Sequence, residues 1–156
     1  MPLQIGQPAP DFILYDSDKK KVGLNEYQGN NVLLLFFPFA FSSVCTAELC
    51  TVRDNISRYG SVQAKVFGIS VDSLYTLARF KIDQNLNFPL LSDFNKEVSY
   101  SYKAFYETFS YGMKGVSKRA AFIIDKFGLV QYVEVLENAS DQPNFDLIIR
   151  RLEELV

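Results

Sequence analysis

The hydrophobic residues of this 156-residue chain gather in unbroken runs and in helix-like spacings. Two runs, NVLLLFF at 31–37 and KVFGISV at 65–71, are apolar over the length of a strand, which is typical of central strands covered on both faces. Apolar positions three and four residues apart indicate helices elsewhere. In chain order the pattern predicts a hairpin over 11–24, a strand over 31–37, a helix over 46–59, a strand over 65–71, a helix over 73–86, a strand over 88–93, a helix over 95–105, a hairpin over 119–135 and a helix over 144–156.

The order of these elements indicates the fold class. Strand–helix–strand units followed by a hairpin predict an α/β fold in which helices flank both faces of a central mixed β-sheet. A thioredoxin-like fold with an N-terminal β-hairpin satisfies that order. The length of the chain suits a single domain over residues 1–156.

Composition and charge narrow the range of partners. The chain has 18 Asp and Glu against 16 Lys and Arg, so nothing electrostatic points to nucleic acid. The Lys19–Lys21 trio is typical of a solvated turn. The longest apolar stretch, 32–41, is too short to span a membrane, and the N-terminus lacks a signal-peptide pattern. We therefore expect a cytoplasmic protein that binds neither nucleic acid nor a membrane.

The chain contains two cysteines and no histidine. The missing histidine excludes a Cys–His protease pair, a Ser–His–Asp triad and a Cys/His zinc site. Two thiols alone are too few for a closed structural zinc site, so we expect no metal. In a reducing cytosol, cysteines five residues apart favour redox or catalytic chemistry over a permanent disulfide.

Cys45 lies in the segment PFAFSSVCTAELC at 38–50, after the predicted central strand and at the start of the next helix. The carboxyl end of a central strand is the usual place for an active site in an open α/β sheet. A thiol in a first helical turn faces unpaired N–H groups and the positive end of the helix dipole, which favour the thiolate. Cys45 is therefore the candidate nucleophile.

Cys50 lies deeper in the same predicted helix and lacks this stabilisation. In an intact helix the Cα atoms of residues five apart are separated by about 8 to 9 Å, whereas a disulfide tolerates no more than about 7 Å. The two cysteines thus cannot form a passive disulfide in the folded state. Two interpretations stay open: a switchable redox pair whose helix unwinds, or two independent thiols.

The acidic residue in the segment SVDS at 70–73 has a structural interpretation. Ser73 is predicted to cap the helix over 73–86, because a serine hydroxyl can accept from an unpaired N–H of the first turn. Asp72 is interpreted as a cap of the same helix rather than as a catalytic group.

The segment PFAFSSVC resembles the peroxiredoxin active-site pattern of Pro, three residues, Thr or Ser, two residues and Cys. Three further segments resemble the same family: GQPAPDF near the N-terminus, FPLLSD at 88–93 and RAAFIIDKFGLVQY from Arg119 onwards. The matches extend over residues 6–135. They look most like the alkyl hydroperoxide reductase E (AhpE) and bacterioferritin-comigratory (PrxQ) branches of the AhpC/TSA superfamily.

The resemblance implies a thiol-dependent peroxidase that needs no metal or organic cofactor. Cys45 would be the peroxidatic cysteine, which attacks hydrogen peroxide or an organic hydroperoxide and becomes a sulfenic acid. Ser42, where the family usually has Thr, would hydrogen-bond the thiolate and the peroxide. Pro38 would shape the loop and keep water from the thiolate.

The remaining roles concern charge and hydrogen-bond donors. Arg119 would favour the thiolate and stabilise the charge that leaves on the second oxygen. Glu48 would orient Arg119, and the backbone N–H groups of Val44 and Cys45 would donate to the peroxide oxygens.

The resemblance also suggests a role for Cys50. It matches the resolving position of PrxQ-type members, which form an intrachain disulfide after the helix unwinds, whereas the AhpE branch often relies on one cysteine and an external thiol. A thioredoxin-, glutaredoxin- or mycoredoxin-like reductant is the expected partner, and the expected assembly is a homodimer, with a monomer as the alternative. Two other functions fit the fold: a thiol–disulfide oxidoreductase, which normally carries Cys-x-x-Cys, and a non-catalytic redox sensor.

Overall fold

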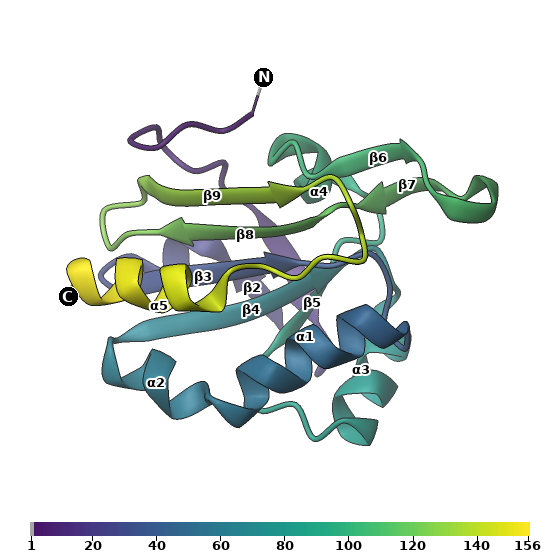
Figure 1. Cartoon of the computed structure of the whole chain (residues 1–156), viewed down its shortest axis with the longest axis horizontal. Helices are drawn as coiled ribbons and strands as arrows, with labels where there is room; N and C mark the ends of the chain where they lie inside the picture. Colours follow the sequence, from purple (N-terminus) through teal and green to yellow (C-terminus); the bar gives the residue numbers. More distant parts are fainter. Residues whose placement is uncertain (1) are drawn as a thin grey trace.

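Residues 2–156 are described by a computed structural model, shown in Figure 1. Its centre is a seven-stranded mixed sheet with the order β2-β1-β5-β4-β3-β8-β9, and a two-stranded sheet of β6 and β7 stands beside it. The strands are β1 (Ile13–Asp16), β2 (Lys21–Gly23), β3 (Asn31–Phe36), β4 (Ala64–Ser70), β5 (Leu90–Ser92), β6 (Phe105–Thr108), β7 (Lys114–Ser117), β8 (Arg119–Ile124) and β9 (Val130–Leu136). The helices are α1 (Ser43–Asp54), α2 (Ile56–Ser61), α3 (Leu74–Asp83), α4 (Glu97–Ser101) and α5 (Phe145–Glu154).

The sheet is built around β3. This strand pairs parallel to β4, from Asn31 opposite Ala64 to Phe36 opposite Ile69. On its other side it pairs antiparallel to β8, where Phe36 lies opposite Ala120. Every residue of β3 is buried, as expected for a strand covered on both faces. The apolar run at 31–37 therefore predicted the central strand correctly.

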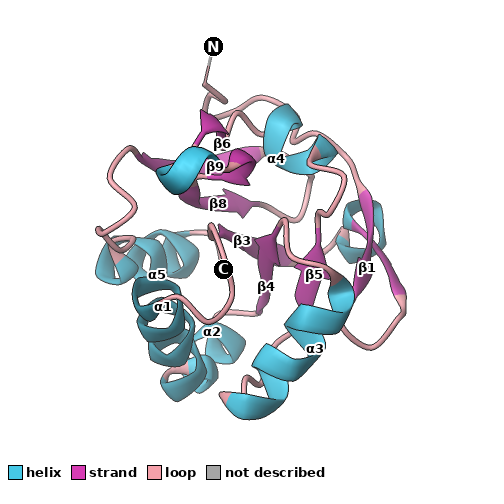
Figure 2. Cartoon of the chain, turned by 90° about the vertical axis from the view of Figure 1, so that its right-hand side faces the viewer, coloured by secondary structure: helices cyan, strands magenta, loops and turns pink. Residues whose placement is uncertain are grey.

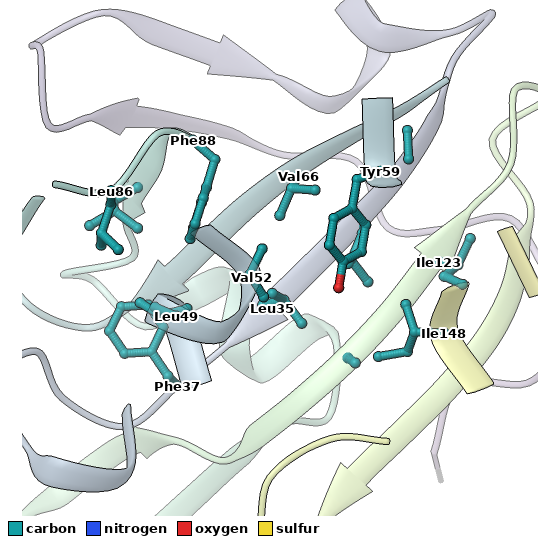
Figure 3. Close-up of a cluster of buried hydrophobic side chains, with 14 of the residues drawn as sticks. Leu35, Phe37, Leu49, Val52, Tyr59, Val66, Leu86, Phe88, Ile123 and Ile148 are labelled. Atoms are coloured by element: carbon teal, nitrogen blue, oxygen red, sulfur yellow. The ribbon is translucent and has the colours of Figure 1, made fainter. Parts of the chain in front are cut away.

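Helices lie on both faces of the sheet (Figure 2). Successive strand residues point to opposite faces, so β3 contributes to two separate cores. Leu33 and Leu35 pack under α1, α2, α3 and α5, in the cluster that Figure 3 shows in part. Leu34 and Phe36 pack on the other face, against α4 and the N-terminal segment. Along residues 2–156, no helix combines the length and the apolar character that crossing a bilayer requires.

The predicted helix over 46–59 is in fact two helices that meet at Asn55. This residue has φ −118° and ψ 19°, which interrupts the helix. Its side-chain amide donates to the Thr51 carbonyl at 2.8 Å and so satisfies one carbonyl at the end of α1. The apolar spacing continues across the break because Val52 of α1 and Tyr59 of α2 are buried in the same core.

Residues 105–117 form a hairpin that the hydrophobic pattern did not predict. The expected helix over 95–105 is shorter, since α4 covers Glu97–Ser101 and Phe105 already belongs to β6. β6 pairs antiparallel with β7, with Phe105 opposite Ser117. Its residues are half-buried or exposed, so they leave no clear apolar alternation. The other predicted elements are present, including the hairpin of β1 and β2, with bounds shifted by a few residues.

Candidate active site

The site begins where β3 ends. Residues 37–42, called the site loop below, connect β3 to α1. The loop first continues the sheet, because the Phe37 N–H donates to the Ile69 carbonyl at 2.9 Å. Pro38 comes next and has no N–H with which to extend the ladder. The chain therefore leaves the sheet at Pro38 and places the N-terminus of α1 at its carboxyl edge.

Cys45 lies in the first turn of α1, and its side chain is 0% exposed. The Thr46 N–H donates to the Ser42 carbonyl at 2.9 Å and closes that turn. The N–H groups of Val44 and Cys45 precede this bond, so the helix offers them no carbonyl partner. The thiol thus occupies the positive end of α1, the position expected from the sequence.

A pocket of about 240 Å³ opens over the first turn of α1. Pro38, Ser42, Val44 and Arg119 all line it, although Arg119 comes from β8, far along the chain. Four of the residues singled out in the sequence therefore meet at one place. The complete lining is Pro38, Phe39, Ser42, Ser43, Val44, Phe109, Ser110, Arg119, Ala139 and Ser140.

Arg119 and Glu48 form a buried ion pair beside Cys45. Arg119 Nη1 donates to Glu48 Oε1 at 2.6 Å, and the exposed fractions of the two side chains are 2% and 0%. The Nε and Nη2 atoms of Arg119 donate to the Ala139 carbonyl at 3.2 and 2.9 Å. The guanidinium is thus fixed both from α1 and from the loop before α5. The contact expected between Glu48 and Arg119 is present.

The two partners of this ion pair respond differently to burial. Burial raises the pKa of Glu48 to about 7; the charge and hydrogen bond of Arg119 oppose the rise, and Glu134 adds to it. Glu48 Oε2 is buried and has no hydrogen-bond partner among residues 2–156, which also disfavours the ionised form. Burial lowers the pKa of Arg119, but its interactions with Glu48 and Cys45 outweigh this and raise it overall. Arg119 therefore stays cationic and interacts with both groups.

Ser42 occupies the N-cap position of α1, but its hydroxyl points elsewhere than predicted. Ser42 Oγ donates to the Phe39 carbonyl at 2.8 Å. The Ser42 carbonyl accepts from both the N–H and the Oγ1 of Thr46. In this structure Ser42 fixes the turn before α1, and a hydrogen bond to Cys45 requires its hydroxyl to leave Phe39.

Both cysteines are free. Cys50 is half-buried in α1, and its sulfur lies 3.6 Å from Oε1 of Gln84. α1 is continuous from Ser43 to Asp54, so the two thiols share one unbroken helix and are not bonded, as the helix geometry predicts. Over residues 2–156 there is no group of three or more His, Cys, Asp or Glu side chains that could hold a metal ion.

A family comparison identifies the chain. The model of the AhpC/TSA family matches residues 5–133, a range that includes Cys45, Cys50 and Arg119. The chain belongs to this family and is a peroxiredoxin. Peroxiredoxins are thiol peroxidases, so the activity implied by the sequence resemblance is confirmed at this level.

Individual relatives agree with this assignment. Alkyl hydroperoxide reductase E of Mycobacterium tuberculosis is 35% identical over 136 residues, which cover 85% of this chain and 86% of that protein. A chloroplastic 2-cysteine peroxiredoxin of Chattonella marina var. antiqua is 35% identical over 164 residues, or 98% of this chain and 80% of that protein. The crystal structure of the peroxidoxin BcpB from Mycobacterium tuberculosis superposes with a TM-score of 0.87 at 28% identity, covering 99% of both chains. The thioredoxin-like peroxiredoxin fold is thereby confirmed.

Two segments of the peroxiredoxin pocket were not found from the sequence. Phe109 and Ser110 come from the tip of the β6–β7 hairpin, and Ala139 and Ser140 come from the loop between β9 and α5. The Phe109 ring lies 6.2 Å from that of Phe39, which joins the hairpin to the site loop. Ala139 acts through its carbonyl, a group that every residue carries. Neither spacing nor residue type could have pointed to it.

Asp72 has a different role from the one expected. Ser73 caps α3 as predicted, since its Oγ accepts from the Thr76 N–H at 3.2 Å. The interpretation of Asp72 as a second cap was wrong. Asp72 Oδ2 accepts from the Ala40 N–H at 2.8 Å, so the carboxylate faces the site loop of this peroxiredoxin instead of α3.

Proposed function

We propose that Cys45 is the peroxidatic cysteine of this peroxiredoxin. The observation that carries the proposal is the buried Arg119 guanidinium, which is anchored by Glu48, interacts with Cys45 and lines the pocket. A cation beside a thiol at a helix N-terminus favours the thiolate, which is the nucleophilic form. The same cation faces the space that a hydroperoxide group would enter.

In the proposed step, the Cys45 thiolate attacks the terminal oxygen of a hydroperoxide, either hydrogen peroxide or an organic one. An S–O bond forms while the O–O bond breaks, so the sulfur loses two electrons and the peroxide gains them. The departing hydroxide or alkoxide takes up a proton and leaves as water or an alcohol. Cys45 is left as a sulfenic acid.

The pocket residues assist this step through charge and hydrogen bonds. Arg119 and the N–H groups of Val44 and Cys45 stabilise the negative charge that develops on the two oxygens. Rotation of the Ser42 side chain away from Phe39 would bring its hydroxyl to the peroxide. Pro38, buried at the start of the site loop, offers no N–H and helps to exclude water from the thiolate.

Cys50 is the proposed resolving cysteine. Its thiol would attack the sulfenic acid of Cys45, forming an S–S bond as the S–O bond breaks and water leaves. The two thiols lie in one helix, so the first turns of α1 must unwind before they can meet. A thioredoxin-, glutaredoxin- or mycoredoxin-like thiol would then reduce the disulfide. If Cys50 does not resolve, the same kind of thiol would reduce the sulfenic acid directly.

We further propose a homodimer as the assembly, with a monomer as the alternative. Two large exposed side chains adjoin the pocket, since Phe41 precedes Ser42 and Tyr111 follows Ser110. Aromatic residues are enriched at protein interfaces, which supports an interface beside the pocket. Sedimentation of the reduced and oxidised protein distinguishes the two states.

Peroxide titration with intact-mass analysis tests both cysteine assignments. After one equivalent of hydrogen peroxide, the wild type should lose the mass of two hydrogen atoms as a Cys45–Cys50 disulfide forms. Cys50→Ser should gain one oxygen atom as a sulfenic acid on Cys45. The reagent dimedone should then form a C–S bond to that sulfur, with loss of the oxygen as water. Cys45→Ser should stay unchanged on the same timescale.

The possible contrary results are distinct. A stable sulfenic acid in the wild type, or a mixed disulfide with an added thiol, would show that Cys50 is not the resolving residue. The assignment of Cys45 as the peroxidatic residue would stand. Peroxidase turnover in Cys45→Ser equal to that of the wild type would show that Cys45 is not the peroxidatic residue.

A further inference from the structure

The site loop is held by a carboxylate that takes no part in the proposed peroxide chemistry. Asp72 follows β4, and its Oδ2 accepts from the Ala40 N–H at 2.8 Å and from Ser70 Oγ at 2.7 Å. Ser92 Oγ, from β5, donates to the Asp72 carbonyl at 2.7 Å. Asp72 is thus hydrogen-bonded to two strands of the sheet and to the site loop.

The residue after Ala40 has a backbone conformation that side chains disfavour. Phe41 has φ +69°, in the left-handed region that is rare for bulky residues. The residue is 50% exposed, and its ring packs edge-on against the buried Phe80 ring of α3, with 5.1 Å between centroids. Such a conformation persists only where its surroundings impose it. The Ala40–Asp72 hydrogen bond is directly adjacent and ties the turn to the sheet.

We infer that Asp72 is a positioning residue of the peroxidase site, which holds the strained site loop so that Pro38 and the first turn of α1 enclose Cys45. The inference rests on the proposed role of Cys45. Without the carboxylate, the Ala40 N–H loses its partner and the turn at Phe41 can relax. Because Ser42 is the N-cap of α1, the first helical turn then loses its fixed starting point.

Two opposite consequences follow for Cys45. Its side chain is 0% exposed while the site loop is held, so a bulky reagent reaches it only when the loop opens. Attack on peroxide, a far smaller molecule, needs the first turn of α1 to hold its N–H donors in line with the thiolate. Loss of Asp72 should therefore make Cys45 more accessible to alkylation and less reactive with peroxide.

The test compares these two rates in Asp72→Ala, built on Cys50→Ser so that Cys45 is the sole thiol. Oxidation by hydrogen peroxide should slow by about tenfold or more, while alkylation by a bulky maleimide should rise by about tenfold. Both donors converge on one oxygen of Asp72. Asp72→Asn can keep an oxygen in that place and should recover most of both rates. Asp72→Ser, whose hydroxyl is too short to reach, gives the same two measurements if the alanine variant does not fold.

Asp125 supplies a matched control. Its carboxylate also accepts from the backbone, taking two N–H groups, from Phe127 and Leu129 at 2.9 and 3.0 Å, and the residue is buried where Asp72 is half-buried. It follows β8, at the end of that strand opposite to Arg119. Asp125→Ala should lower stability and leave both Cys45 rates within about twofold of the parent. In the Cys45→Ser background, Asp72→Ala should likewise leave the alkylation of Cys50 within about twofold.

Several results would overturn the inference. Wild-type rates of oxidation and alkylation at Cys45 in Asp72→Ala would do so, as would equal changes in Asp72→Ala and Asp125→Ala. In both cases the proposed function stands, because Cys45 is still oxidised in the parent. If Cys45 of the parent is not oxidised by peroxide, the proposed function fails and the inference fails with it.

Discussion

Replacing Arg119 with methionine should slow the oxidation of Cys45 by hydrogen peroxide by about 100-fold or more. The guanidinium is the cation that interacts with both Cys45 and the pocket, so methionine removes charge and donors together. Arg119→Lys keeps the charge but not the planar set of donors. Its rate of Cys45 oxidation should therefore lie between those of the wild type and Arg119→Met. The chain has no tryptophan, so rapid quenching followed by mass spectrometry is the suitable measurement.

The same substitution should also affect stability, and a double variant separates the two effects. Arg119→Met leaves Glu48 buried without its partner, at a cost of about 3 to 5 kcal/mol in the free energy of unfolding. Adding Glu48→Gln removes the orphaned acid and should restore most of the stability, but not the rate. Restoration of the rate by the double variant would mean that Arg119 serves the fold and not the reaction.

Replacing Glu48 with glutamine should remove a large part of the pH dependence of stability between about pH 4.5 and 7. Burial raises the pKa of Glu48 from 4.5 to about 7, so the folded protein binds this proton more tightly than the unfolded chain does. Such a group stabilises the fold fully below the unfolded pKa, and the contribution disappears as the pH rises through the folded pKa. The difference amounts to about 3 kcal/mol at most.

Urea unfolding at pH 5 and pH 8 measures this effect. The wild type should lose more of its unfolding free energy than Glu48→Gln when the pH rises between these values. The chain has no histidine, so few other groups titrate in this interval. Burial also raises the pKa of Asp72 and Asp93, but these carboxyls are present in both proteins and cancel in the comparison. An equal loss in the two proteins would show that Glu48 is ionised throughout.

The sequence determined the central parts of the fold because their burial is uniform. β3 is buried along its whole length, so its apolar run needed no tertiary context to be interpreted. The break at Asn55 was missed because α1 and α2 bury the same face and the spacing continues across it. The β6–β7 hairpin was missed because β6 packs only partly and its residues show no clean alternation.

The sequence likewise predicted some residues of the candidate site and missed others. Helix physics alone placed Cys45 at the start of α1, whereas Arg119 was found only through the family resemblance, since no local pattern links β8 to α1. The role of Ala139 depends on its backbone carbonyl, which every residue carries, so the sequence could not predict it. Asp72 was assigned to the wrong neighbour because its partner, Ala40, lies 32 residues earlier in the chain.

The rate at which Cys45 reacts with hydrogen peroxide tests the central claim most directly. Cys50→Ser leaves Cys45 as the sole thiol, and Cys45→Ser leaves Cys50 as the matched control. In rapid-quench experiments on the two folded variants, Cys45 should react roughly a thousand-fold or more faster than free cysteine, and Cys50 no faster than free cysteine. Reaction of Cys45 at the rate of free cysteine would contradict the assignment of Cys45 as the peroxidatic residue.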